Sequence, residues 1–587
     1  MRIPRPRSIS FTPFVSDVKG YKPSFLRDDL LAALAVALMT IPQSIAYSLL
    51  AGLPPTAGLF SAIFGTIFTA SLGSSRTLVS GPSTGTAILL QTSLADVLYS
   101  YFENVSGAQQ EAIVLMILMQ IVLAVGLIQI GAAFFNVSKL LQFVGRPVVL
   151  GYFGGITVAI AITQMFSFTG ISSPPSDEPL LIQAGLFFML LPQLKWTTFL
   201  VGIVSLSLLV SMRYYLKNWP HALIMIIAGA FLAEGLNLWS MAAPVKMLGN
   251  LQLPQNPFPE MTFPILHLKI LNKIFPAAVA IAFLGILEVF SISRTFGAKT
   301  GQKIQVNQDV FGLGVSNVVL ASVIGAMPSS GSATRTALNY RLHAKTRFSA
   351  IFSGLITGSL LFFFWPLVAH IPLAALAALL IASVHTLMDW KEIQLIFRAT
   401  RQDASVFLLT FLSCLFFSLD VAFFIGIVIS IATYLQRSST PHLVEYAFNS
   451  KGRLIVVNTR EEVHRKVRII GIGGELYFAA ADVFQTALQA VADDPHVQAI
   501  VLRLNNVHHM DASMCLAILH LYETLRSTNR YFVISGLTEE VWHVFHRAGV
   551  VKEIGFDNLY FTDESNPQFS TWKAALRAQE LIHKVNG

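Results

Sequence analysis

Two short stretches of the chain decide its fold: PSTGTA at residues 82–87 and PSSGSA at residues 328–333. Both are small and polar, yet each lies in a very apolar neighbourhood. Each has the composition of a helix start, because Pro suits the first turn and Ser or Thr can cap exposed N–H groups. We therefore expect both stretches to begin short helices. A small-residue motif that packs two membrane helices together is the alternative interpretation.

The overall composition places these stretches in a membrane protein. Of the 587 residues, 54% are hydrophobic and only 12% are charged, about half the charged fraction of a soluble domain. Apolar runs long enough to cross a bilayer recur up to residue 436 and then stop. We expect a cytoplasmic N-terminal segment, a transmembrane domain, a linker, a soluble domain and a tail, at 1–28, 29–436, 437–452, 453–575 and 576–587.

The apolar runs predict fourteen membrane spans in two sets of seven. Lys and Arg collect on alternate connections, which places both termini in the cytoplasm by the positive-inside rule. The formal net charge of +8 comes from these cations, so we expect no nucleic-acid partner. Because each set has an odd number of spans, the second set must run inverted relative to the first. The spans are predicted at 29–50, 56–72, 83–100, 109–134, 146–168, 196–216 and 219–237, and at 275–296, 309–326, 331–343, 346–370, 372–387, 403–417 and 420–436.

The two quoted stretches open the third span of each set, where short, interrupted segments point to a transporter's substrate site. In inverted halves, the N-termini of these two helices face each other near the bilayer midplane. Each helix end offers N–H donors and about half a positive charge, so the gap between them suits an anion. The substrate-site residues predicted from the two stretches are Ser83, Thr84, Gly85, Ser330, Gly331 and Ser332.

Three further polar residues inside spans are candidates for the same site. Arg335 follows the second stretch, and its planar fork suits an oxyanion, although the side chain could instead extend to the cytoplasmic surface. Gln43 and Tyr47 lie four residues apart on one helical face and can offer an amide and a hydroxyl to one ligand. A polar pair that joins two helices is the alternative for these two residues.

Glu288 is the clearest acid inside a span, with apolar residues on both sides. A carboxylate in this setting either pairs with a cation or is protonated. We expect Glu288 to couple transport to a cation or a proton. A neutral acid that is hydrogen-bonded to a neighbouring helix is the structural alternative.

The soluble domain alternates strand-like and helix-like runs, which predicts a small sheet covered by helices. The loop NNVHHMDAS at 505–513 joins a strand to a helix, with Asp511 as the N-cap. It lacks a Gly-rich phosphate cradle and paired carboxylates, so we expect an interaction or regulatory module and no enzyme. The cysteines and histidines show no metal-ligand spacing, and we expect no metal or cofactor.

Segments from both domains together resemble the sulfate permease (SulP) family of anion transporters. The resemblance implies seven-plus-seven inverted repeats divided into a core and a gate domain, a cytoplasmic STAS domain and a homodimer. The segments are IPQSIAYSLLAGLPPTAGLFSA at 41–62, SSRTLVSGPSTGTA at 74–87, LEVFSISRTFGAK at 287–299, VNQDVFGLGVSN at 306–317, PSSGSATRTALN at 328–339 and VHHMDAS at 507–513.

The resemblance also assigns individual residues. It places Gln43, Tyr47, Ser83, Thr84, Thr334 and Arg335 around the substrate, and it gives Glu288 the acidic position associated with cation or proton coupling.

Two departures from the family pattern bear on coupling and regulation. Some relatives carry an acid in the first span where this chain has Gln43, which shifts any coupling role toward Glu288. In bacterial proteins that share the STAS fold, a phosphorylated serine directly follows the loop aspartate. Here Ala512 follows Asp511 and the serine is Ser513, so Asp511 and Ser513 are only weak regulatory candidates.

The sequence therefore predicts secondary active transport of a small inorganic oxyanion, with sulfate favoured, coupled to protons or sodium by an elevator-like movement. Sodium-dependent transport of bicarbonate or a dicarboxylate is the runner-up. An uncoupled anion channel or an anion-sensing regulator is the alternative from another class. The expected setting is a bacterial inner membrane, and the expected partners are the lipid bilayer, a second copy of the chain and a regulatory protein at the STAS domain.

Overall fold

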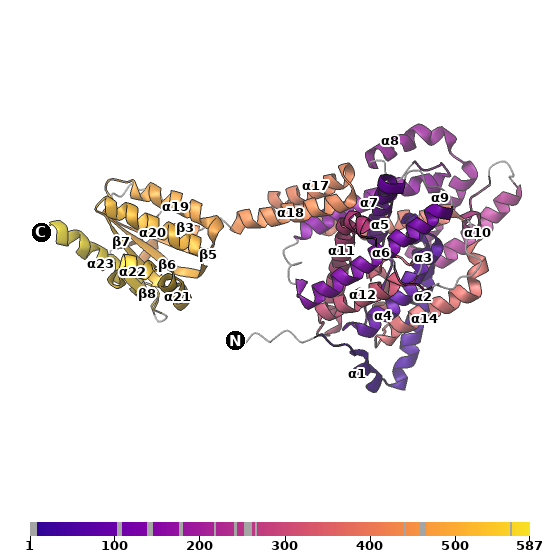
Figure 1. The fold of residues 1–587 in the computed structure, drawn as a ribbon, viewed down its shortest axis with the longest axis horizontal. Coiled ribbons are helices and arrows are strands. Elements are labelled where there is room, and N and C mark those ends of the chain that lie inside the picture. Colours follow the sequence, from indigo (N-terminus) through magenta and orange to yellow (C-terminus); the bar gives the residue numbers. More distant parts are fainter. Residues whose placement is uncertain are drawn as a thin grey trace. The chain divides into compact units, whose positions relative to one another are not determined.

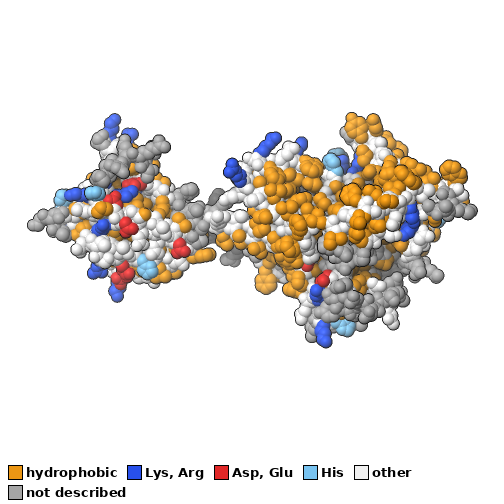
Figure 2. Space-filling model, turned by 90° about the horizontal axis from the view of Figure 1, so that it is seen from above, with side chains coloured by type: hydrophobic (Ala, Val, Ile, Leu, Met, Phe, Trp, Pro, Cys, Tyr) orange, Lys and Arg blue, Asp and Glu red, His pale blue; other side chains and the backbone are white. Residues whose placement is uncertain are grey.

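The chain divides into two compact units, Met1–Ser430 and Ile431–Gly587, each described here by itself (Figure 1). The first unit is helical, and hydrophobic side chains cover much of its visible face in Figure 2. The second unit contains a mixed sheet with covering helices. The computed structural model describes residues 9–102, 108–137, 145–174, 180–216, 219–239, 244–251, 261–264, 267–323, 325–438, 442–449, 451–457, 465–563 and 566–586.

One group of helices in the first unit contains both quoted stretches. We call it the core group, because its members pack mainly on one another. Its elements are α2 (Pro23–Leu50), α3 (Pro55–Phe60), the π-helical η1 (Ser61–Gly65), α4 (Thr66–Leu72), β1 (Ser80–Gly81), α5 (Thr84–Phe102), α6 (Ala108–Phe134), α11 (Leu268–Thr300), α12 (Val306–Ala321), β2 (Ser330–Gly331), α13 (Ala333–Arg341) and α14 (Phe348–Val368). The short helix α1 (Phe14–Lys19) precedes them and is tied to α14 through an ion pair of 2.5 Å between Asp17 and Arg347.

The remaining helices of the first unit form the gate group. Its elements are α7 (Arg146–Thr169), α8 (Leu180–Leu190), η3 (Leu191–Gln193), α9 (Trp196–Tyr215), α10 (His221–Trp239), η4 (Leu248–Leu251), α15 (Leu373–Leu387), α16 (Trp390–Ala399), α17 (Arg401–Phe416) and α18 (Leu419–Ser438). The core and gate groups touch chiefly where α2 packs on α10 and α15, and where α5 packs on α7.

The packing of the helices recurs when the two halves of the sequence are exchanged. α6 packs on α12 as α14 packs on α4, and α2 packs on α14 as α11 packs on α6. In the gate group, α7 packs on α17 as α15 packs on α9. In each of these comparisons, the first helix pair is converted into the second when every span is replaced by its counterpart in the other set of seven. A twofold relation between two inverted halves produces this pattern.

All fourteen predicted spans are helical, but the count of fourteen crossings is not confirmed. Among the described residues, ten helical runs are long and apolar enough to cross a membrane. Four predicted spans are not among these ten runs. One is α5, which has a polar start, and the others are α12, α13 and α17, which have 16, 9 and 16 residues. The helices α8 and α16 were not predicted.

The hairpin of α17 and α18 turns beside the middle of α7. A Cβ atom on Gly151 would lie 2.6 Å from the carbonyl oxygen of Phe407, and one on Gly155 would overlap Cys414. α17 then ends at Phe416. α7 continues from Gly155 to Thr169, about 20 Å further at 1.5 Å per residue. α17 therefore reaches only part of the way along α7.

The second unit is a six-stranded sheet of order β4-β3-β5-β6-β7-β8. β3 pairs antiparallel with β4 and β5, and the remaining neighbours are parallel. Along β6, Ile500 and Leu502 face the core beneath α19 and α20, while Ala499 and Val501 face α23. This alternation confirms the predicted sheet with helices on both faces. The elements are β3 (His442–Phe448), β4 (Leu454–Val456), β5 (Val467–Leu476), α19 (Phe478–Ala492), β6 (Ala499–Met510), α20 (Ala512–Ser527), β7 (Tyr531–Leu537), α21 (Glu539–Arg547), α22 (Val550–Ile554), η5 (Phe556–Asn558), β8 (Leu559–Phe561) and α23 (Phe569–Asn586).

Candidate functional site

The two quoted stretches meet in a two-stranded antiparallel pair inside the core group. Ser80 of β1 lies opposite Gly331 of β2, and Gly81 lies opposite Ser330. All four residues are buried. Because the strands are antiparallel, the helices that follow them leave from opposite ends of the pair. The N-termini of α5 and α13 therefore lie close together in the interior of the core group.

Side chains of neighbouring helices hold each strand in this register. The Thr66 hydroxyl donates to the carbonyl oxygen of Ser80 at 2.5 Å. Asn317 holds the other strand twice: its amide nitrogen donates to the carbonyl of Ser329 at 3.1 Å, and its oxygen accepts from the N–H of Ser329 at 2.7 Å. The amide of Asn317 also donates to Gln129 at 2.8 Å. Before the first strand, the N–H of Val79 donates to the Thr336 hydroxyl at 3.0 Å, so side chains hold both strands.

Both helices have a serine cap, but the two phrases are not in equivalent positions. Ser83 accepts from the N–H of Thr86 at 3.3 Å, and Ser332 accepts from the N–H of Arg335 at 3.4 Å. PSTGTA begins α5, whereas PSSGSA forms β2 and ends where α13 begins. The cap Ser83 is the second residue of the first phrase, whereas the cap Ser332 is the fifth residue of the second phrase. A residue-by-residue match of the two phrases is therefore shifted by three residues from the match of the two caps.

Both helices carry a Thr-x-Thr-Ala run in the first turn, TGTA at 84–87 and TRTA at 334–337. Gly85 follows its cap by two residues, and Arg335 follows its cap by three. The Arg335 side chain is fully buried, and its Nη2 donates to the carbonyl oxygen of Pro82 at 2.6 Å. Its Nε and Nη1 have no hydrogen-bond partner within the described residues. A buried cation thus reaches from one half of the molecule to the start of the helix in the other.

Gly81 makes room for the Arg335 guanidinium. A Cβ atom on Gly81 would lie 2.6 Å from Nη1 of Arg335, and the φ angle of Gly81 is +141°. Residues other than glycine rarely adopt this backbone conformation. Gly81 was not among the predicted site residues, although its place directly before PSTGTA could have suggested a close approach of the backbone.

Glu288 of α11 lies between the two strand–helix units. Its Oε1 accepts from the Ser83 hydroxyl at 3.3 Å, and Ser330 and Arg335 are among its electrostatic neighbours. The second oxygen, Oε2, is buried and has no hydrogen-bond partner in the described part of the chain. A Cβ atom on Gly85 would lie 3.6 Å from Oε1. The predicted acid is thus beside both helix starts.

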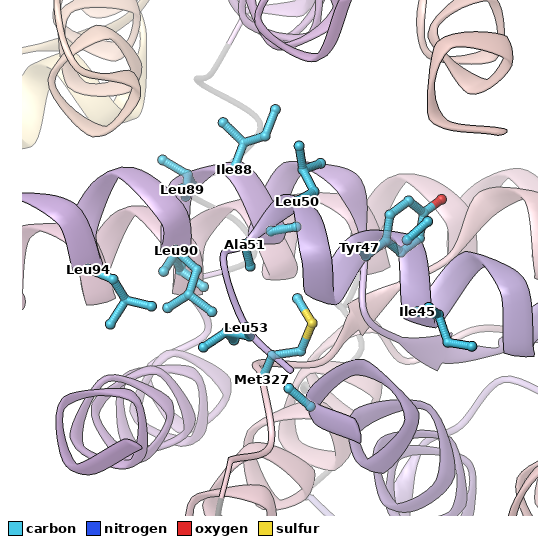
Figure 3. Packing of buried hydrophobic residues seen from close by; sticks show 14 of the residues in the cluster. Ile45, Tyr47, Leu50, Ala51, Leu53, Ile88, Leu89, Leu90, Leu94 and Met327 are labelled. Carbon is cyan, nitrogen blue, oxygen red and sulfur yellow. The ribbon is translucent and has the colours of Figure 1, made fainter. Parts of the chain in front are cut away.

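Gln43 and Tyr47 of α2 are both buried, each with an exposed fraction of 8%. The Gln43 Oε1 atom has no hydrogen-bond partner among the residues described. Thr84, Arg335 and Glu288 are electrostatic neighbours of the Tyr47 hydroxyl. In Figure 3 this hydroxyl points away from the aliphatic side chains of α5 and the α2–α3 connection. The Tyr47 hydroxyl is thus directed toward Thr84, Arg335 and Glu288, and its role in substrate binding remains a prediction.

The remaining predicted substrate residues lie at the start of α13. Thr334 is partly exposed, and its hydroxyl lies 3.5 Å from that of Ser332. The Ser330 hydroxyl is buried and has no hydrogen-bond partner among the described residues. A Cβ atom on Gly331 would lie 3.0 Å from Ile292 and 3.2 Å from Val289, both on α11. The two stretches, α2 and α11 thus converge on one site.

The gate group faces this site through α7. The Ile156 side chain would lie 3.7 Å from a Cβ atom on Gly85. Tyr152, one helical turn earlier, is buried, packs edge-on against Phe423, and has a hydroxyl without a partner among the described residues. The sequence analysis missed Tyr152, because an aromatic residue in the run GYFGG is typical of helix packing.

Comparison with known proteins identifies the family of this chain. The family model described as "Sulfate permease family" matches residues 26–410. The chain belongs to the sulfate permease family. A second model, the STAS domain, matches residues 455–565, so the helical unit is the permease domain and the sheet-containing unit includes the STAS domain. The family transports anions and does not consist of enzymes, as predicted.

The alignments with relatives of this permease cover most of the length of each relative. "Probable sulfate transporter 4.2" of Arabidopsis thaliana is 29% identical over 558 residues, which cover 90% of this chain and 79% of the relative. "Putative sulfate transporter YvdB" of Bacillus subtilis (strain 168) is 25% identical over 549 residues, covering 93% of this chain and 98% of the relative.

Solved structures confirm the helical membrane fold. Murine Slc26a9, an anion transporter in the inward-facing state, aligns with a TM-score of 0.87 at 20% identity, covering 99% of this permease and 97% of that chain. The transmembrane domain of the cyanobacterial bicarbonate transporter BicA aligns with a TM-score of 0.59 at 18% identity, covering 70% and 98%. At these identities the likeness establishes the fold alone.

In the STAS domain, Asp511 holds two helix starts. Its Oδ1 accepts from the N–H of Met514 in α20 at 3.0 Å, and its Oδ2 accepts from the N–H of Phe478 in α19 at 2.6 Å. The predicted N-cap is thus confirmed, while a regulatory role of Asp511 and Ser513 remains a prediction. Burial raises the pKa of the nearby Cys515 thiol to about 11, which keeps this thiol protonated at neutral pH.

Proposed function

We propose that this chain is a secondary active transporter of a small inorganic oxyanion, with sulfate as the favoured substrate. One observation carries the proposal: the buried Arg335 guanidinium lies at the meeting point of two helix N-termini, and two of its nitrogen atoms, Nε and Nη1, have no hydrogen-bond partner among the described residues. Helix N-termini and a planar guanidinium both favour oxyanions.

The unpaired polar groups around Arg335 support binding from several sides. The predicted substrate residues come from α2, from the start of α5 and from β2 with the start of α13. Glycines at positions 81, 85 and 331 let the Arg335 side chain and α11 approach the backbone closely there. A buried polar atom without a partner costs free energy, so a ligand that satisfies several such atoms is favoured.

Glu288 supports coupling to a cation or a proton. Its Oε2, together with the hydroxyls of Ser83 and Ser330, forms a set of oxygen atoms beside the anion site. Oxygen ligands suit small hard cations, and a carboxylate in this setting can instead take up a proton. Neutralisation of Glu288 by either ion would then favour an anion a few ångströms away.

The division into core and gate groups supports an elevator-like movement. Every predicted substrate residue and Glu288 lie on core elements, while the gate group contributes Ile156 and Tyr152 at the boundary. A movement of the core group against the gate group would therefore carry the whole site. We propose that the chain spans a bacterial inner membrane with both termini in the cytoplasm. We also expect a homodimer and a regulatory protein partner at the STAS domain.

The names of two relatives favour sulfate, and the fold shared with BicA keeps bicarbonate as the second candidate. The test is uptake by purified protein in proteoliposomes of sulfate, bicarbonate, chloride and fumarate, with an imposed proton or sodium gradient. We expect sulfate to accumulate above its external concentration under one of the two gradients, and Arg335→Gln to abolish this uptake.

Accumulation of bicarbonate with sodium, and none of sulfate, would replace the proposal with its runner-up. A flux that only follows the anion gradient would identify an uncoupled channel. Absence of any anion flux from folded protein, with anion binding retained, would favour an anion-sensing regulator.

A further inference from the structure

Two short helices outside the spans differ sharply in charge although they occupy related places in the two halves. α8 follows α7, and α16 follows α15, the counterpart of α7. α8 reads LLIQAGLFFML and has no charged residue, whereas α16 reads WKEIQLIFRA. α8 comes after the end of α7, while α16 is tied to the first residue of α7 by an Arg146–Glu392 ion pair of 2.7 Å.

The two helices lie toward opposite ends of α7. α8 packs on the second half of α7, where Phe187 meets Phe166, and on α17, whereas α16 is held at the first residue of α7. α7 has 24 residues and is about 36 Å long, which exceeds the thickness of about 30 Å of a hydrocarbon core. α16 is thus at the membrane surface from which α7, α17 and the C-terminal end of α18 emerge. α8 and α16 therefore belong to opposite sides of the bilayer.

α16 is amphipathic, and part of its apolar surface is uncovered by protein. Ile393 and Ile396 are buried against the gate group. Trp390, Leu395 and Phe397 remain 53%, 66% and 47% exposed. Exposed leucines continue along the middle of α17, at Leu408, Leu409 and Leu412. The uncovered face of α16 is therefore continuous with the lipid-facing surface of a membrane helix.

Cations surround this apolar face. Lys391, Arg398 and Arg401 are exposed and form no ion pair with another residue that the structure describes. The acid of the helix, Glu392, is already bound by both arms of Arg146, at 2.7 and 2.9 Å. A helix with a partly exposed Trp and unpaired cations fits the headgroup layer of a membrane with anionic lipid.

From this arrangement we infer that α16 is an interfacial helix that binds anionic phospholipid headgroups through Lys391 and Arg398. The uncharged α8, toward the other end of α7, does not have this preference. The occupant is a lipid because the apolar face continues a lipid-facing surface, and it is anionic because the cations of α16 lack acidic partners among the described residues. Each cation near a membrane surface favours anionic lipid by a factor of about five.

The natural residue Trp390 allows a direct test with the full chain in phosphatidylcholine vesicles. These vesicles contain the same fraction of either brominated phosphatidylglycerol or brominated phosphatidylcholine, and bromine quenches a Trp that it touches. The difference in emission between the parent and Trp390→Phe isolates Trp390. We expect quenching by both lipids, with an apparent contact preference of about fivefold or more for phosphatidylglycerol.

Two charge variants separate headgroup binding from general attraction. Lys391→Gln/Arg398→Gln should keep the quenching and lose the preference. Lys299→Gln/Lys303→Gln removes two exposed cations from the same membrane side in the core group and should leave the preference unchanged. Equal quenching by the two lipids in the parent would overturn headgroup recognition. Absence of quenching by either lipid would show that protein, from the STAS domain or a second copy, covers this face.

Discussion

The unit of β1 with α5 and the unit of β2 with α13 share one backbone plan but differ in chemistry. In each, a two-residue strand leads to a helix with a serine cap. In the first turn after the cap, one unit has Gly85 and the other has Arg335. The first unit is therefore neutral, while the second supplies a buried cation. An internal repeat can thus preserve backbone geometry while each copy takes a different part in one site.

The largest effects should come from filling the space beside the two strands. Gly85→Leu and Gly331→Leu place bulk where a Cβ alone would lie 2.8 Å from Leu284 or 3.0 Å from Ile292. Each should abolish binding of radiolabelled sulfate. Gly185→Leu on α8, where a Cβ meets nothing within 4 Å, is the control and should bind normally. Normal binding by either site variant would show that the two units do not share a site.

Arg335→Gln tests the charge that distinguishes the two units. Charged hydrogen bonds contribute about 1.5–3 kcal/mol, so we expect sulfate affinity to fall by roughly 10- to 150-fold in equilibrium binding. Arg335→Lys keeps the positive charge but loses the planar set of N–H donors, so its sulfate affinity should lie between those of the parent and of Arg335→Gln. Affinity unchanged in the Gln variant would leave the two helix ends as the whole anion site.

Glu288→Gln addresses the residue that lies between the two units. The amide resembles the protonated acid, so exchange of anion across the membrane should continue while accumulation driven by protons or sodium is lost. Counterflow and gradient-driven uptake by the same preparation measure the two properties. Undiminished accumulation would make Glu288 a structural acid and place coupling elsewhere.

Asn317 makes two hydrogen bonds beside its strand and Thr66 makes one, which predicts different losses of stability when each is replaced. Asn317→Leu leaves the N–H and the carbonyl of Ser329 without their side-chain partner, at a cost of about 2–3 kcal/mol. Thr66→Val removes one bond to Ser80 and should cost about 1 kcal/mol. Thermal unfolding of the detergent-solubilised protein compares the two. Equal destabilisation would mean that the strands are equally anchored.

The smallest effect is expected from removal of the STAS domain. Every residue assigned to the anion site precedes Gln436, so a chain that ends there should bind sulfate with the parent's affinity. Equilibrium binding to the folded, truncated protein is the measurement. A folded truncation that fails to bind would mean that the STAS domain completes the site.

The fold was predictable because its strongest signals are local. Apolar runs predicted each helix of the two sets, and the polar phrases predicted where the halves meet. α8 and α16 were missed, because α8 lies outside the predicted runs and α16 mixes charge with apolar residues. The partial length of α17 depends on contacts of Gly151 and Gly155 with another helix, which composition does not report.

The site was predictable in its residues but not in its register. Arg335, Glu288, Gln43 and Tyr47 stand out as polar groups within spans. The mismatch arose because Pro-Ser-x-Gly occurs in both halves, whereas the capping serines, Ser83 and Ser332, have different places in the two phrases. The hydrogen bond from Arg335 to the carbonyl oxygen of Pro82 could not be predicted, because a backbone acceptor does not depend on the identity of the residue that carries it.

The pairing of β1 with β2 limits how such a protein could have arisen. Each half contributes one strand, whose N–H and C=O groups need a partner because lipid offers none. A chain with only one half would have to meet another copy inserted in the opposite orientation before either strand could be satisfied. An ancestor with only one half of the permease domain would therefore have formed a dimer of two oppositely inserted copies. Duplication and fusion of its gene would have fixed the two orientations in one polypeptide.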